Sequence, residues 1–324
     1  MIINKIVRSV SPDEIRNIVR DVENTVLPPE IELWSKEYQT RIGTRSPFTW
    51  YWLYNVVRLS RFIPTDAMYE ASLDAVRFLV SMFVIVLDDS ADVLQDEKIF
   101  SSLAQIPFYG AGNSTDKHIQ FAASLWHAVR KDIQKLPRYN EFKDLFYFDL
   151  TQVINTTKYG LLINQYPYLI NKEEYWLYFP TTMQAMLYTT ILLMGSSIEK
   201  EQVGKIRELS FFAQHMVRIG NWMSTWEREL QESDVTSIVF PYALEEGFFS
   251  LEDILYHKTD ILKKADQASL HDLMIKKLSG EWESYYGKIE QLGKMYEDLL
   301  PYVQILLPQL ERMLVIELAS KSLK

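Results

Sequence analysis

The sequence predicts an all-α protein in which residues 1–324 form a single helical bundle. Apolar residues follow a helical spacing nearly throughout, and few stretches show the two-residue alternation typical of strands. Only 11 Gly and 12 Pro interrupt the chain, and they cluster between the helical stretches. A hydrophobic content of 48% is enough for a sizeable core. We therefore expect about ten helices of roughly 15–25 residues in one domain.

Short segments rich in Pro, Gly and polar residues separate the expected helices. These breaks are LPPE (27–30), FIPTD (62–66), IPFYGAGNSTD (106–116), NQYPYLINKEE (164–174), FPTT (179–182) and MGSSIEKEQ (194–202). The most apolar stretch, RFLVSMFVIV at 77–86, is predicted to form a long helix that ends at LDDSAD, 87–92. Ser250, followed by Glu252 and Asp253, is typical of a further helix start.

Composition excludes several classes of partner and site. The net charge of −9 argues against nucleic acid, because phosphate binding needs clustered Lys and Arg. The longest apolar runs, near 78–87 and 185–195, are about half the length of a membrane span, so no span is expected. The first residues lack an apolar signal core, so we expect a cytoplasmic protein. With no cysteine, a metal ion would need oxygen or imidazole ligands.

An acidic cluster ends the most apolar helix. Asp88 and Asp92 are four positions apart and therefore share one helical face, and Asp89 lies about a quarter turn away. A solvated helix end explains most such clusters. Here the ten preceding residues are almost all apolar, which favours a helix that is buried on most sides. The three carboxylates are therefore candidate metal ligands at the mouth of the core.

A second cluster lies in RIGNWMSTWERE at 218–229. Asn221, Thr225 and Glu229 are spaced by four and four, so an amide, a hydroxyl and a carboxylate line one helical face. Oxygen ligands of these kinds suit Mg²⁺, which also binds phosphate oxygens. Arg218 and Arg228 are within reach of such a phosphate. Taken together, the two clusters fit a diphosphate held through bridging Mg²⁺ ions, whereas each alone is compatible with an ordinary polar helix face.

In order and spacing, these motifs resemble those of class I terpene synthases. DDSAD at 88–92 is similar to the DDxxD motif of that family, and NWMSTWERE at 221–229 is similar to its second motif, NDxxSxxKE. The flanking segments RLSRFIPTD at 58–66 and SIVFPYALEEGFFSLEDI at 237–254 also resemble the family. The resemblance covers roughly residues 50–260.

The resemblance implies a bundle with a central apolar cavity, three Mg²⁺ ions and a prenyl diphosphate substrate. Its metal ligands would be drawn from Asp88, Asp89, Asp92, Asn221, Thr225 and Glu229, with Arg218 and Arg228 binding the diphosphate. Ionisation would release diphosphate and give a carbocation that cyclises to a terpene hydrocarbon or alcohol. Aromatic faces attract cations, and the candidates for this role are Phe83, Tyr178, Phe179 and Trp222. The resemblance is also compatible with a homodimer.

Three departures from the family pattern leave alternatives open. Trp222 replaces an acidic residue, EEYWLYFPTTMQAM at 173–186 has no Arg where bacterial relatives carry a diphosphate sensor, and Arg312 lacks a following Tyr. The helix break at Pro180 is still expected. Geranylgeranyl diphosphate is the favoured substrate, followed by farnesyl diphosphate. The alternatives are a kaurene-synthase-like enzyme acting on a bicyclic C20 diphosphate, a non-catalytic prenyl-diphosphate-binding relative, a chain-elongating or head-to-head prenyltransferase, and a helical scaffold protein.

Overall fold

The computed structural model describes residues 3, 11–232, 234–256, 267–321 and 323. Within these residues the protein is all-helical, as predicted, and the only β-type pairing is an isolated bridge between Thr65 and Ser196. The α-helices are α2 (Pro12–Glu23), α3 (Pro29–Arg41), α4 (Phe48–Leu59), α5 (Glu70–Asp92), α6 (Glu97–Tyr109), α7 (Lys117–Ile133), α8 (Tyr139–Gln165), α9 (Lys172–Tyr178), α10 (Ala185–Met194), α11 (Lys200–Glu232), α12 (Val239–Glu245), α13 (Leu251–Tyr256), α15 (Gln267–Met295) and α16 (Leu300–Ala319). Between some of them lie short 3₁₀ helices, which are η1 (Pro167–Leu169), η2 (Phe179–Met183) and η4 (Glu297–Leu299).

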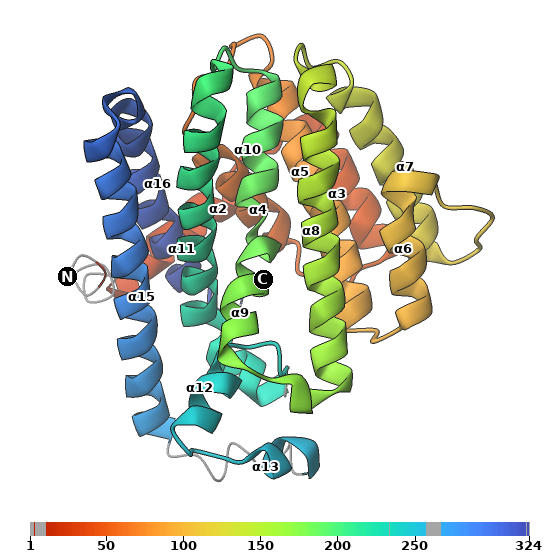
Figure 1. Cartoon of the computed structure of the whole chain (residues 1–324). Helices are drawn as coiled ribbons and strands as arrows, with labels where there is room; N and C mark the ends of the chain where they lie inside the picture. Colours follow the sequence, from red (N-terminus) through yellow and green to blue (C-terminus); the bar gives the residue numbers. More distant parts are fainter. Residues whose placement is uncertain (1–2, 4–10, 233, 257–266, 322, 324) are drawn as a thin grey trace.

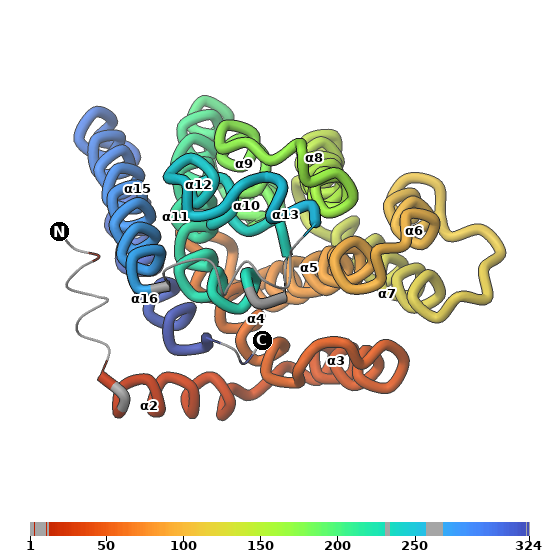
Figure 2. The backbone as a smooth tube through the Cα atoms, turned by 90° about the horizontal axis from the view of Figure 1, so that it is seen from below, coloured from red at the N-terminus to blue at the C-terminus, as the bar shows by residue number. Residues whose placement is uncertain are grey.

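The long helices lie side by side in a bundle (Figure 1). Helices α15 and α16 form one flank, α8, α10 and α11 lie towards the middle, and α6 and α7 form the other flank. Seen from below, α2 and α3 run along one side of the bundle (Figure 2). One large cluster of buried apolar side chains extends from α3 to α16. The long helices therefore share a common core.

Helix α5 is deeply buried in this bundle. Apart from Ile85 and Asp88, every residue from Leu73 to Ala91 is buried, and α5 packs against α4, α7 and α8. The apolar run at 77–86 thus forms a central helix, as its composition predicted, and carries the acidic cluster to its C-terminal end.

Residues Glu297–Ala319 are the one described stretch that is long and apolar enough to cross a membrane. The sequence pattern did not single out this stretch. In the structure α16 packs against α2, α4, α11 and α15, so its apolar side chains already have protein neighbours. Of the 18-residue window with this composition, 44% is buried inside the bundle.

Candidate active site

The two predicted motifs line the same cavity. This cavity has a volume of about 360 Å³ and lies between α4, α5, α8, η2, α10 and α11. Helix α5 contributes Asp88 and Asp92, and α11 contributes Asn221, Thr225 and Glu229. Five of the six expected metal ligands, which lie far apart in the sequence, are therefore brought together around one space.

Helical periodicity explains which residues face this cavity. On α5 the lining residues Ser81, Ile85, Asp88 and Asp92 are separated by four, three and four positions. On α11 a similar row runs from Arg218 to Glu229. Such spacings keep side chains on one face of a helix over several turns. The predicted spacing of the motifs is what aims both rows at the same cavity.

Burial disfavours the charged form of the first-motif carboxylates. Asp88 is half-buried, and its pKa is raised chiefly by burial, although the nearby Arg45 guanidinium opposes this rise. The pKa of Asp92 is raised well above its ordinary value, first by burial and then by the neighbouring charges of Asp88 and Asp234. Carboxylates held this close together are stabilised by cations.

Asp89 does not line the cavity, contrary to the expectation that it is a metal ligand. Its side chain is 1% exposed and accepts hydrogen bonds from Tyr38 Oη and Thr44 Oγ1, both at 2.6 Å. Arg45 Nε donates to its other oxygen at 2.6 Å. Both oxygens of Asp89 are thus engaged by α3 and the segment that follows it. The quarter-turn offset from Asp88 turns this side chain away from the cavity.

The second motif forms a buried polar row with unused atoms. Arg218 Nη1 donates to Asn221 Oδ1 at 2.9 Å, and Thr225 Oγ1 donates to Glu229 Oε1 at 2.7 Å. Glu229 Oε2 and Arg218 Nε are buried and have no hydrogen-bond partner among the described residues. Burial raises the pKa of Glu229 and lowers that of Arg218. Buried polar atoms without partners are costly, so a ligand that satisfies them is favoured.

The six expected substrate-binding residues divide into two groups. Arg218, Arg228 and Phe179 line the cavity. Phe83, Tyr178 and Trp222 do not line it, so their expected role is not supported by the structure.

Each of these three aromatic residues packs elsewhere. Phe83 packs against Trp126 with ring centroids 4.9 Å apart, between α5 and α7. Tyr178 is 37% exposed and packs on Tyr159. Trp222 is fully buried, and its ring lies 4.8 Å from the Arg218 guanidinium carbon. Trp222 therefore supports a cavity-lining cation and does not face the cavity itself.

The expected helix break at Pro180 is confirmed. Helix α9 ends at Tyr178, the 3₁₀ turn η2 follows, and α10 begins at Ala185. Gln184, between η2 and α10, has a left-handed backbone with φ of 61°. This conformation is uncommon for a residue with a side chain and is found where the surrounding structure requires it. Phe179, Thr182, Met183 and Gln184 all line the cavity, so the break forms part of its wall.

Sequence reasoning missed several polar residues of the cavity. Arg45 reaches it from the segment between α3 and α4, and its Nη2 lies 3.3 Å from Asp88 Oδ2. Other polar lining residues are Thr49, Ser81, Gln95, Thr156, Thr157, Asn164, Thr182, Gln184, Tyr188, Asp234, Thr236 and Glu317. Arg45 lies outside any segment with helical periodicity, so residue spacing could not identify it as a cavity residue. The signal that could have found it is its position three residues before a helix rich in aromatic residues.

The oxygen donors around the cavity come from several different elements. Within the described ranges, no three Asp, Glu or His side chains lie close enough together to hold a metal ion by themselves. A cation at this site would therefore also need neutral oxygens such as those of Asn221 and Thr225, and oxygens of a bound ligand.

Comparison with known proteins adds no assignment. A scan of the sequence against models of protein families finds no match, and a search among curated proteins finds no relative either. Any function must therefore be argued from the residues and geometry of this chain.

Proposed function

We propose that this protein is a class I terpene synthase that ionises a prenyl diphosphate with the help of Mg²⁺ and cyclises the resulting carbocation. Geranylgeranyl diphosphate is the favoured substrate and farnesyl diphosphate the next. The observation that carries this proposal is that both oxygen-rich motifs line one cavity, to which α4, α5, α11 and η2 also contribute apolar side chains. A helical bundle with a ligand site between its helices is compatible with such an enzyme.

The residues at the mouth fit a hard divalent cation. Asp88 and Asp92 offer carboxylate oxygens from α5, and Asn221, Thr225 and Glu229 offer three kinds of oxygen from α11. The buried, unpartnered Glu229 Oε2 is an oxygen for which a cation would be the natural partner. When bound, Mg²⁺ supplies a Lewis acid that neutralises negative charge on the departing diphosphate. From the family resemblance we expect three such ions.

Three arginine residues are placed to hold the diphosphate. Arg218, Arg228 and Arg45 all line the cavity. Arg218 has a buried Nε without a partner among the described residues, and its guanidinium carbon lies 4.8 Å from the Trp222 ring and 5.6 Å from the Phe179 ring. Guanidinium groups suit phosphate oxygens because they present several donors in a fixed plane. These arginines take the place of the sensor arginine that the α9–η2 segment lacks.

The walls away from the mouth suit an isoprenoid chain. Leu53, Val56, Val84, Ile85 and Val217 line the cavity together with Phe179. The volume of about 360 Å³ lies within the range of roughly 300–1,000 Å³ that is typical of small-molecule pockets. Apolar side chains exclude water from a reactive cation, and the Phe179 ring offers it a π face.

The experiment is incubation of the purified protein with Mg²⁺ and, separately, geranyl, farnesyl, geranylgeranyl and bicyclic C20 diphosphates. Released diphosphate and extracted products are measured, the latter by gas chromatography with mass detection. A cyclic product from one substrate supports the synthase and fixes its chain length. Elongation in the presence of isopentenyl diphosphate would instead indicate a prenyltransferase. Tight binding without turnover of any substrate would indicate the non-catalytic relative.

A further inference from the structure

The inner end of the cavity carries a cluster of polar side chains. Ser81, Gln184 and Tyr188 line it, and they are 1%, 8% and 5% exposed, respectively. Ser81 precedes Asp88 by seven residues on the same helix, which corresponds to about 10 Å along the axis. The polar cluster therefore lies two turns deeper than the carboxylates at the mouth.

Hydrogen bonds join the three side chains into one cluster. Tyr188 Oη lies 2.5 Å from Ser81 Oγ, and Ser81 Oγ lies 3.0 Å from Gln184 Oε1. Ser81 has a single hydrogen, which it donates either to Gln184 or to the Arg77 carbonyl at 3.0 Å. The Tyr188 hydroxyl is then the donor to Ser81. This arrangement leaves both lone pairs of Tyr188 Oη available.

Gln184 leaves a donor available beside this acceptor. Its Oε1 lies 3.0 Å from Ser81 Oγ, and its Nε2 makes no hydrogen bond to the residues that the structure describes. The left-handed backbone of Gln184, at the junction between η2 and α10, sets the direction in which its side chain leaves the main chain. A water molecule needs two to four polar partners to be held in a protein interior. Gln184 Nε2 as donor and Tyr188 Oη as acceptor supply two.

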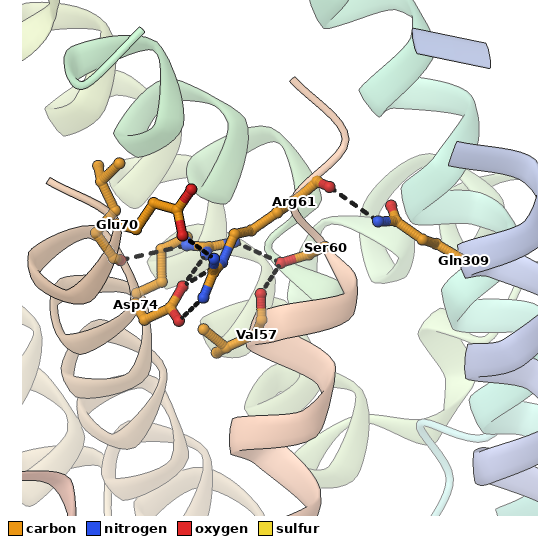
Figure 3. Close-up of polar contacts among 8 residues, drawn as sticks. Val57, Ser60, Arg61, Glu70, Asp74 and Gln309 are labelled. Carbon is orange, nitrogen blue, oxygen red and sulfur yellow. Dashed lines mark hydrogen bonds and ion pairs between the residues drawn. The ribbon is translucent and has the colours of Figure 1, made fainter. Parts of the chain in front are cut away.

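A buried ion-pair network packs against the Tyr188 side of the cluster. The Arg77 guanidinium is fully buried and lies 5.6 Å from the centre of the Tyr188 ring. Its Nη1 donates to Ser60 Oγ at 2.6 Å, and its Nη2 contacts Asp74 Oδ1 at 2.5 Å. Figure 3 shows that Asp74 and Glu70 both converge on Arg61, which ties the start of α5 to the end of α4. Tyr188 therefore packs on a buried network in which positive and negative side chains are paired.

We propose that Ser81, Gln184 and Tyr188 hold a water molecule at the inner end of the cavity, and that this water ends the reaction so that the product is an alcohol. This role depends on the proposed synthase reaction. Accepting one hydrogen from Gln184 Nε2 and donating one to Tyr188 Oη leaves the water oxygen a second lone pair. Leu53 and Val56 of α4 and Val84 and Ile85 of α5 also line the cavity, so we expect this lone pair to meet the hydrocarbon part of a bound substrate.

The chemistry balances without a further reactant. The ester C–O bond breaks and its electron pair leaves with diphosphate. A lone pair of the water oxygen then forms a new C–O bond to the cyclised cation. The oxonium loses one proton, which is carried by solvent to the released diphosphate. The sum is a prenyl diphosphate plus water giving a cyclic alcohol plus hydrogen diphosphate.

The test compares the wild-type chain with Tyr188→Phe and Gln184→Met in water enriched in ¹⁸O, with Mg²⁺ and the substrate that the wild type turns over. Diphosphate release and the ratio of alcohol to hydrocarbon are measured together. We expect wild type to give an alcohol that carries ¹⁸O. Each variant loses one hydrogen bond to the water, so its ratio should fall about fivefold or more while diphosphate continues to be released.

The control is Ser210→Ala, which removes a buried hydroxyl from a pair with Thr189 (2.7 Å) that does not line the cavity. Its product ratio should equal that of wild type. A hydrocarbon product from wild type, an alcohol whose oxygen is unlabelled, or an unchanged ratio in both variants would overturn the water site while leaving the synthase intact. No diphosphate release from any substrate would remove the synthase and the water site together. Circular dichroism shows whether each variant is folded, and Tyr188→Phe keeps the ring that packs over Arg77.

Discussion

Arg45 and Asp89 are in direct contact beside the cavity, with Arg45 Nε 2.6 Å from Asp89 Oδ1. The same guanidinium also reaches Asp88, which does line the cavity. Asp89, with Tyr38 and Thr44, therefore anchors the segment between α3 and α4 against the C-terminal end of α5. Asp89 therefore stabilises the packing of two segments, whereas the adjacent Asp88 faces the cavity.

This contact predicts a stability effect of Arg45→Gln. Removing the cation leaves the buried Asp89 charge without its ionic partner, and such losses cost about 3 kcal/mol of unfolding free energy. Urea unfolding measured with and without the substitution gives the difference. Arg16→Gln, which breaks the exposed pair with Asp13, is the matched control and should leave stability unchanged. Equal stability of Arg45→Gln and wild type would contradict the anchoring role.

Asp88 and Asp89 are adjacent in the first motif, but replacing each by asparagine should affect a different property of the protein. Asp88→Asn should lower turnover by more than about 100-fold and leave the melting temperature nearly unchanged, because Asp88 faces the cavity. Asp89→Asn should lower the melting temperature, because it weakens a buried network. Diphosphate release and thermal unfolding are measured on both proteins. Full activity of Asp88→Asn would contradict its placement in the metal site.

The raised pKa of Asp92, at the mouth of the cavity, predicts that the stability of the metal-free protein depends on pH. The pKa of Asp92 is raised well above its ordinary value of 3.8, so the folded chain holds this proton more tightly than the unfolded chain does. The free energy of unfolding contributed by Asp92 is therefore fully present below pH 3.8 and is lost as the pH rises through the raised pKa. Asp92→Asn removes this loss and should stabilise the metal-free protein at neutral pH.

The measurement for Asp92 is urea unfolding in EDTA at several pH values. The gain of Asp92→Asn over wild type should grow from acidic to neutral pH. A gain that is constant with pH, or a loss at neutral pH, would show that this carboxylate is not strained by burial. Added Mg²⁺ and diphosphate should stabilise wild type more than the variant.

The network beneath the cavity predicts a contrast between two acids that contact the same arginine. Asp74→Asn should cost about 3 kcal/mol, because the fully buried Arg77 loses its counter-charge. Glu70→Gln should cost less than about 0.5 kcal/mol, because the Glu70 side chain is 44% exposed. Thermal or urea unfolding separates the two variants, and similar losses for both would be inconsistent with the assigned burial.

Periodicity predicted the parts of the site that belong to helices. Asp88 with Asp92, and Asn221 with Thr225 and Glu229, were placed correctly on shared faces because steps of four residues keep side chains aligned. The all-helical fold followed from the same pattern. The helix break near Pro180 followed from the conformational limits of proline.

Sequence spacing did not show which residues line the cavity where the deciding contact is with another element. Phe83 is two residues from Ser81, about 200° around the helix, and therefore faces α7 and not the cavity. Trp222 is adjacent to a lining residue but packs under Arg218. Arg45 lies outside any helix, so only the packing of its segment against α5 brings it to the carboxylates. Residue spacing along one element does not define such neighbours.

The most direct test of the proposed activity is diphosphate release from geranylgeranyl diphosphate in the presence of Mg²⁺, with the organic products identified by mass detection. The synthase predicts Mg²⁺-dependent release accompanied by a cyclic C20 product, and loss of both in Asn221→Ala. Release that persists without Mg²⁺ or in Asn221→Ala, or no release from this and the shorter or bicyclic diphosphates by folded protein, would contradict it.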